Sequence, residues 1–193
     1  MNFLYDRKES IALTENLKIF GLKPNVYTVI DEKSLIKTLE IINIDFSKKR
    51  NKSKTTIIPL IHLSCHGTKE QIILSNDDRI EYNDFGKLIK KNCNSFFYNG
   101  TPALHICMSS CYGIQMVTAD NNKLSSPYAV VIGCNKSIRW EDALLGFSIF
   151  YHNFIVKNWN IVDTFNDMNF STSKRKTFWL YISKEIDNKI KEK

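Results

Sequence analysis

The chain has 193 residues, 43% of them hydrophobic and 24% charged, which is close to ordinary globular usage and excludes a disordered chain. A chain of this length buries enough surface to fold as a single domain, residues 1–193, without disulfides. The formal net charge of +7 invites a nucleic-acid interpretation, but the basic runs at 48–54 and 174–176 are typical of solvated loops. We therefore do not expect nucleic acid to be a partner.

The sequence carries no membrane or export signal that we recognise. No run of 18 apolar residues is present, and the N-terminus lacks the basic and apolar segments of a secretory signal. The sequence therefore predicts a cytoplasmic protein with no membrane partner. Five cysteines at scattered positions do not suggest a disulfide framework, so their thiols are available for chemistry.

Helices and strands are predicted to alternate along the first third of the chain. Residues 10–20 have helical apolar spacing, residues 26–30 are rich in β-branched side chains, and residues 35–43 predict a second helix. After a basic loop, the apolar run over 57–64 is typical of a strand covered on both faces, with Pro59 at its start.

The same alternation continues to the end of the chain. The later predicted elements are a hairpin over 71–82, a helix from 83 or 84, a strand over 103–110, a helix from 114, a strand over 128–133, helices over 141–156 and 160–168, and a strand over 178–182. Strands that alternate with helices predict an α/β domain with a mainly parallel sheet and right-handed crossovers.

Two of the predicted strands end in residues that suit thiol catalysis. His66-Gly67 follows the strand over 57–64, and Cys111 follows the strand over 103–110. The carboxyl ends of parallel strands are where open α/β sheets hold their chemistry. A cysteine thiolate can attack a carbonyl carbon while an imidazole takes the thiol proton and later protonates the leaving amine. We expect Cys111 to be the nucleophile, His66 the base, and the N–H groups of Gly67 and Cys111 the oxyanion donors.

This pattern resembles the caspase-like cysteine peptidases, in which the catalytic histidine precedes the cysteine by about 50 residues. Here the two are 45 residues apart, and the segment Ser110-Cys111-Tyr112-Gly113 is nearer to the CHAT branch, the caspase-like domains related to separase. The stretch from 130 to 151 also looks like that branch. The resemblance implies a three-layer α/β/α fold with about six strands, a Cys-His dyad, and neither cofactor nor metal.

The resemblance also implies a substrate preference and a mode of control. In separase and CHAT relatives, an acidic residue after the next strand contributes to a pocket for arginine or lysine, and Glu141 and Asp142 occupy the matching place, with Asp142 the stronger candidate. The helix dipole alone also favours carboxylates there. We expect cleavage of a specific protein substrate after a basic residue, activated by a separately encoded protein in a bacterial defence or cell-death pathway.

Three alternatives remain open on the residues alone. Cys107 is a rival nucleophile inside the same predicted strand, although burial would make it inert. A zinc site is suggested by three histidines and three cysteines, His62, His66, His105, Cys65, Cys107 and Cys111, but residues along strands diverge to opposite faces and do not have the spacing of zinc ligands. A catalytically inactive caspase-like module that binds proteins through the same cleft is the third.

Overall fold

The computed structural model describes residues 8–117, 126–173 and 177–183. Its centre is a four-stranded sheet in the order β1 (Leu60–Ser64), β7 (His105–Ser109), β8 (Val130–Cys134) and β9 (Phe178–Ile182). The first three strands are parallel, and β9 runs antiparallel to β8. The predicted α/β class is confirmed, but in the described residues the central sheet has four strands rather than about six.

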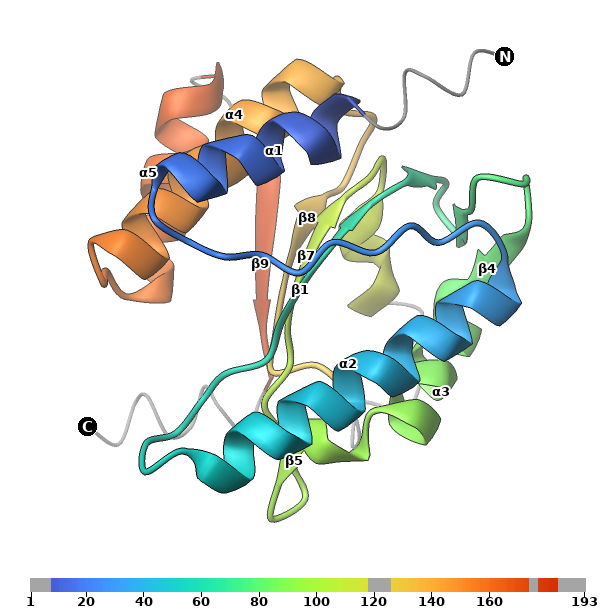
Figure 1. Ribbon diagram of the computed structural model, residues 1–193. Helices are drawn as coiled ribbons and strands as arrows, with labels where there is room; N and C mark the ends of the chain where they lie inside the picture. Colours follow the sequence, from blue (N-terminus) through green and yellow to red (C-terminus); the bar gives the residue numbers. More distant parts are fainter. Residues whose placement is uncertain (1–7, 118–125, 174–176, 184–193) are drawn as a thin grey trace.

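Helices cover both faces of the sheet (Figure 1). One face carries α1 (Lys8–Ile19), α4 (Trp140–Tyr151) and α5 (Ile161–Ser173); the other carries α2 (Glu32–Lys52) and α3 (Tyr82–Asn92). Strand side chains alternate between two cores, because Ile106 and Met108 pack with α2 and α3, whereas Cys107 packs with α1 and α4. A π-helical turn, His152–Val156, continues α4.

Local side chains account for where the helices begin. Asp31 caps α2, since its carboxylate accepts from the Ser34 N–H at 2.7 Å while the Asp31 N–H donates to the Ser34 hydroxyl at 3.0 Å. Asn160 caps α5 as the sequence predicted, accepting from the N–H of Asp163 at 2.9 Å. On α1, Leu13 is buried and belongs to the core beneath the helix.

The basic segment from Lys48 was predicted to be a loop, and this was wrong, because α2 continues to Lys52. Arg50 shows why: its guanidinium donates to the carbonyls of Ser95 at 2.6 Å and Phe97 at 3.2 Å. Basic side chains in the last turn also interact favourably with the helix dipole. The second basic run, 174–176, lies outside the described residues.

The first predicted strand, 26–30, is not a strand in the structure. The Ile30 carbonyl accepts from the Asn76 N–H at 3.1 Å, and Val26 is 61% exposed. The next predicted strand, β1, lies at the edge of the sheet and is half-buried rather than covered on both faces. Pro59 precedes β1 as expected, and its carbonyl accepts from the His105 N–H at 2.9 Å.

Two small antiparallel sheets lie outside the central one. The predicted hairpin is β3 (Gln71–Ile73) with β4 (Arg79–Glu81), and β2 (His66–Gly67) joins it as a third strand. The other sheet pairs β5 (Phe97–Tyr98) with β6 (Thr101–Pro102). Short 3-10 turns cover Asn94–Phe96 and Gly113–Val117, the second standing where a longer helix was expected.

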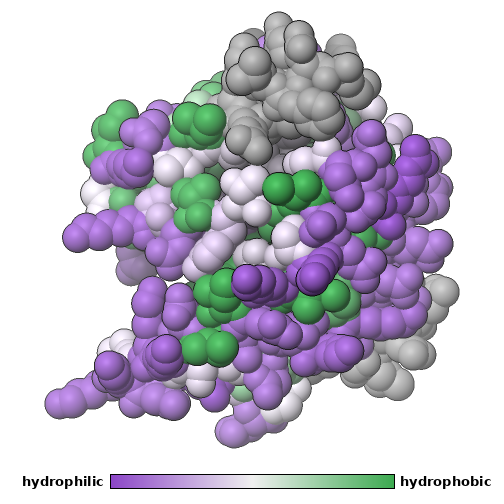
Figure 2. All heavy atoms as spheres, turned by 45° about the vertical axis from the view of Figure 1, so that its right-hand side comes forward, coloured by the Kyte–Doolittle hydropathy of each residue, from purple (hydrophilic) through white to green (hydrophobic). Residues whose placement is uncertain are grey.

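The surface over α2 and α3 is mostly hydrophilic, with apolar residues in small separate patches (Figure 2). Within the described residues, no helix has both the length and the apolar character needed to cross a bilayer. Hydrophilic side chains dominate the face of the molecule that this view presents.

Candidate active site

His66 and Cys111 follow two strands that pair directly. Along the parallel pair β1 and β7, residue partners differ by 45 positions throughout, up to Ser64 opposite Ser109. The Cys65 N–H donates to the Ser109 carbonyl at 3.4 Å, and this bond completes the last pair of the ladder, Ser64 with Ser109. Two residues beyond that pair, His66 begins β2 and Cys111 lies in the turn after β7. In Figure 1 these strand ends lie at the top of the molecule.

Both side chains face the segment that leads into α4. The exposed His66 ring stands edge-on to Trp140, the first residue of α4, with ring centroids 5.8 Å apart. The half-buried Cys111 Sγ lies 3.9 Å from the Ile138 carbonyl oxygen. An imidazole and a thiol therefore border one short stretch of chain, on the α4 side of the sheet.

Gly67 lies in close contact with the backbone of Cys111. A Cβ built on Gly67 would be 2.4 Å from the Cys111 carbonyl oxygen, so only glycine fits without a shift of the chain. The Thr68 N–H donates to the Gln71 carbonyl at 2.8 Å, so these two residues form a hydrogen-bonded pair of the β2–β3 hairpin. Because hydrogen-bonded and non-hydrogen-bonded pairs alternate along antiparallel strands, the adjacent pair, Gly67 and Ile72, is not hydrogen-bonded. The Gly67 N–H consequently points away from β3, as an oxyanion donor requires.

Cys111 occupies a tight turn after β7. The Gly113 N–H donates to the Ser110 carbonyl at 3.3 Å, and Tyr112 between them has φ 57°, in the left-handed region. A non-glycine residue in that region costs about 1–3 kcal/mol and persists where the surroundings enforce it. Here a Cβ on Gly113 would come within 2.6 Å of the Met108 Cβ, which shows how closely the turn packs on its own strand.

Tyr82 ties this turn to the hairpin. Its hydroxyl lies 3.0 Å from the Thr68 carbonyl and 3.4 Å from the Tyr112 carbonyl, so one buried group contacts both segments that flank the candidate dyad. The Tyr112 N–H donates to the Lys136 carbonyl at 3.1 Å on the opposite side. Burial raises the pKa of Tyr82 well above its ordinary value, so the hydroxyl remains a proton donor.

The other thiols are chemically quiet. Burial raises the pKa of Cys65, Cys93, Cys107 and Cys134 to about 12 in each case, so all four remain protonated at neutral pH. Cys107, the rival nucleophile, is 1% exposed. A thiol attacks as thiolate, and access is a second requirement. The half-buried Cys111 is therefore favoured over the enclosed Cys107 as the nucleophile.

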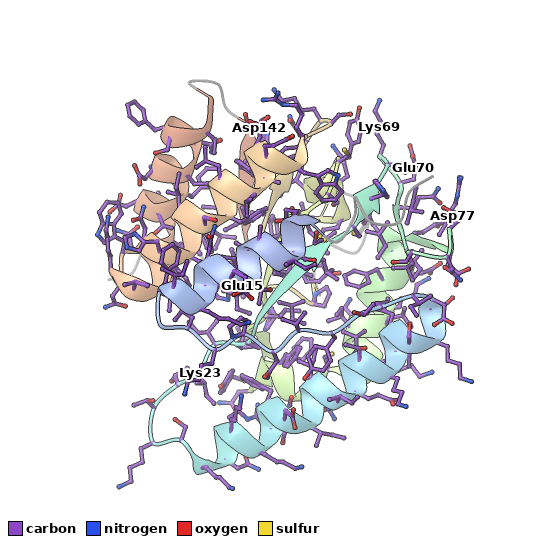
Figure 3. All side chains as sticks on the ribbon, turned by 45° about the horizontal axis from the view of Figure 1, so that its top comes forward. Glu15, Lys23, Lys69, Glu70, Asp77 and Asp142 are labelled. Carbon is purple, nitrogen blue, oxygen red and sulfur yellow. The ribbon has the colours of Figure 1, made fainter. Side chains whose placement is uncertain are left out.

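Charged groups of both signs surround the strand ends. The Asp142 carboxylate forms a two-pronged ion pair with Arg139 at 3.0 and 3.3 Å, while Glu141 is exposed. Figure 3 shows Asp142 on α4 and Lys69 and Glu70 after β2, all at the end of the molecule where the parallel strands terminate. A basic substrate side chain would therefore compete with Arg139 for Asp142.

The interior histidines have protein partners. His62 Nδ1 lies 3.0 Å from the Tyr151 hydroxyl, and His105 Nδ1 lies 3.0 Å from the Ala103 carbonyl. Burial lowers the pKa of His105, so this ring is neutral. Over the described ranges, no three histidine, cysteine, aspartate or glutamate side chains are grouped closely enough to hold a metal ion.

Sequence reasoning missed three residues that bear on this site. Nothing local in the sequence connects Trp140 to His66 or Tyr82 to the cysteine turn, because both contacts join distant segments. The third is Glu9 on α1, which is buried at 2% exposure. A signal for Glu9 was present, since it lies four residues before the buried Leu13 and therefore on the apolar side of the helix.

Comparison with known proteins identifies no relative of this chain. No family model matches the chain, and no curated protein matches it. The chemistry of the site therefore follows from the paired strand ends and the side chains beside them.

Proposed function

We propose that this protein is a cysteine endopeptidase that hydrolyses peptide bonds in a protein substrate through a dyad of His66 and Cys111. The observation that carries the proposal is the close approach of Gly67, the residue after His66, to the carbonyl of Cys111, at the ends of the paired strands β1 and β7. This contact holds the histidine-bearing strand against the cysteine turn. The resemblance of the sequence to the CHAT branch of the caspase-like peptidases supports the same proposal.

In this mechanism His66 takes the proton from the Cys111 thiol, and the thiolate attacks the carbonyl carbon of the scissile bond. The N–H groups of Gly67 and Cys111 stabilise the tetrahedral oxyanion; loss of one such donor costs about 3–4 kcal/mol. The protonated His66 gives its proton to the leaving amine, and the C–N bond breaks to leave a thioester on Cys111. Water, deprotonated by His66, then hydrolyses the thioester and regenerates the thiol.

A thiol-reactive peptide probe with a basic residue at the cleaved position tests this directly. We expect covalent modification at Cys111, located by mass spectrometry, that His66→Ala abolishes. Cys107→Ala serves as the matched control and is expected to be modified at the wild-type rate. Modification that survives His66→Ala, or that maps to another cysteine, would rule out the dyad. No modification at all would favour the inactive protein-binding module.

Cleavage after a basic residue depends on Asp142. Its carboxylate already binds a guanidinium, that of Arg139, with two contacts, so its geometry suits an arginine side chain. We expect Asp142→Asn to reduce kcat/KM for an arginine peptide about 10-fold or more, whereas Asp84→Asn, which breaks a similar ion pair with Lys87 on α3, leaves it unchanged. A peptide-library digest with no basic preference would exclude this role.

Control of the enzyme is proposed to come from a separately encoded activating protein, in a bacterial defence or cell-death pathway and in the cytoplasm. The support is the resemblance to small CHAT-type proteases, together with the exposed position of His66 at the molecular surface. Purified chain alone is expected to cleave basic peptides slowly. Full activity on generic basic peptides without any partner would refute the need for activation.

A further inference from the structure

A buried carboxylate, that of Glu9, contacts the strand that leads to His66. Glu9 is the second residue of α1 and is 2% exposed, a position that is costly for a charge without partners. Its Oε2 accepts from the Ser64 hydroxyl at 2.5 Å, and its Oε1 lies 3.6 Å from His62 Nε2. Burial acts to raise the pKa of Glu9, but His62, Ser64 and Ser109 together lower it below its ordinary value, so the group is ionised at neutral pH.

The position of this carboxylate in the sheet gives it a link to the site. Ser64 and Ser109 are register partners, and each stands two residues before a member of the dyad, Ser64 before His66 and Ser109 before Cys111. Two residues along a strand return to the same face about 6.5 Å further on. The contact with Glu9 therefore fixes Ser64, the last residue of β1, and Ser64 pairs with Ser109 at the end of β7.

The network also reaches α4. The Nδ1 atom of His62 meets the hydroxyl of Tyr151 at 3.0 Å, and the His62 ring packs edge-on against Phe147 at 4.8 Å between centroids. Both aromatic residues belong to α4, which begins at Trp140 beside His66. One ionised group thus joins α1, the strand that leads to His66 and the helix that borders the site.

We infer that Glu9 is a positioning residue for the proposed reaction: through Ser64 and His62 it holds the end of β1, and with it the paired end of β7, the two strand ends that His66 and Cys111 follow. It touches neither the substrate nor the reacting atoms. This inference rests on the proposed function for its consequence in turnover, but the fixing of the strand ends is measurable whether or not the protein is an enzyme.

The test compares Glu9→Gln with Glu15→Gln. The first keeps the shape and one acceptor oxygen but removes the charge. The second removes a charge on the same helix whose side chain is 61% exposed and pairs with Lys18 at 2.7 Å (Figure 3). Ser64→Ala is a milder third variant that keeps the carboxylate. Thermal unfolding is measured first, and all later assays are run well below the unfolding temperature of each variant.

Backbone hydrogen exchange is measured over residues 64–67 and 109–113, together with kcat and KM on a basic peptide. For Glu9→Gln we expect exchange at least 10-fold faster in both segments, kcat about 10-fold lower, and KM within twofold of wild type. Ser64→Ala should change exchange in the same segments by a smaller factor, and Glu15→Gln should change nothing.

Unchanged exchange at both strand ends, or an equal increase across the whole chain, would overturn the inference. Faster exchange at the strand ends with an unchanged kcat would overturn the positioning role in the reaction. If wild type itself neither cleaves peptide nor reacts with the probe, the proposed function fails, and the exchange measurement alone then decides whether Glu9 holds the strand ends.

Discussion

Gly67→Ala tests how closely the histidine-bearing strand approaches the cysteine turn. The added Cβ would stand 2.4 Å from the Cys111 carbonyl oxygen and 3.3 Å from both the Cβ and the Oγ of Ser110. Contacts of this kind essentially never fall below 3.0 Å, so β2 and the turn must separate by at least about 0.6 Å, the difference between 3.0 and 2.4 Å. The atom in the way belongs to the backbone, so no side-chain rotation relieves the clash.

The expected magnitude follows from that forced shift. Backbone displacement by an added methyl group in a packed site costs about 1–3 kcal/mol. For a chain of this length each kcal/mol lowers the unfolding temperature by about 2–4 °C. Misplacement of reacting groups by about 1 Å can cost 10²-fold in rate, so a shift of about 0.6 Å should slow modification of Cys111 about 10-fold or more.

Gly86→Ala is the matched control for this prediction. Gly86 lies inside α3, and a Cβ there would meet the Tyr128 hydroxyl at 3.5 Å and Pro127 Cγ at 3.9 Å, both ordinary contacts. Alanine inside a helix is about 0.5–1 kcal/mol more favourable than glycine, so this variant should unfold slightly higher and react at the wild-type rate.

The assay combines thermal unfolding with the rate at which the peptide probe modifies Cys111. We expect the two alanine variants to move in opposite directions in stability and to differ clearly in rate. If Gly67→Ala unfolds at the wild-type temperature and reacts at the wild-type rate, β2 does not lie against the turn, and the geometric argument for the dyad is lost.

Three further predictions rest on the surroundings of the site. Tyr82→Phe removes the hydroxyl that contacts the Thr68 carbonyl, which should cost about 0.5–1.5 kcal/mol in urea unfolding and slow modification of the cysteine; unchanged values would mean that this bond does not hold the turn. The pKa of Glu9 is lowered in the folded state, so its ionised form stabilises the fold above its ordinary value of 4.5, and that stability is lost as the pH falls through the folded pKa. The free energy of unfolding of wild type should therefore fall more steeply below pH 4.5 than that of Glu9→Gln, which lacks the ionised partner of His62; parallel curves would contradict this. Iodoacetamide should leave Cys107 unmodified in the folded protein at neutral pH, since burial raises its pKa to about 12, and rapid modification there would contradict its enclosure.

Local pattern in the sequence was sufficient for most of the elements. The apolar run that ends before His66 and the one that ends before Cys111 both predicted strands, and β1 and β7 lie inside them. Helical spacing likewise predicted α1, α4 and α5 within a few residues, because amphipathic periodicity is a property of neighbouring positions. The α/β class and both members of the candidate dyad could therefore be named without coordinates.

Contacts between distant segments decided the rest. Whether 26–30 forms a strand depends on a partner ladder that the described residues do not provide there, and the last turns of α2 depend on carbonyls that Arg50 reaches some 45 residues later. The register of β1 with β7, the closeness that requires Gly67, and the burial of Glu9 against Ser64 each join residues that the sequence keeps far apart. Periodicity reports which face of an element is apolar, but only the pairing of strands and the packing of helices determine which side chains meet.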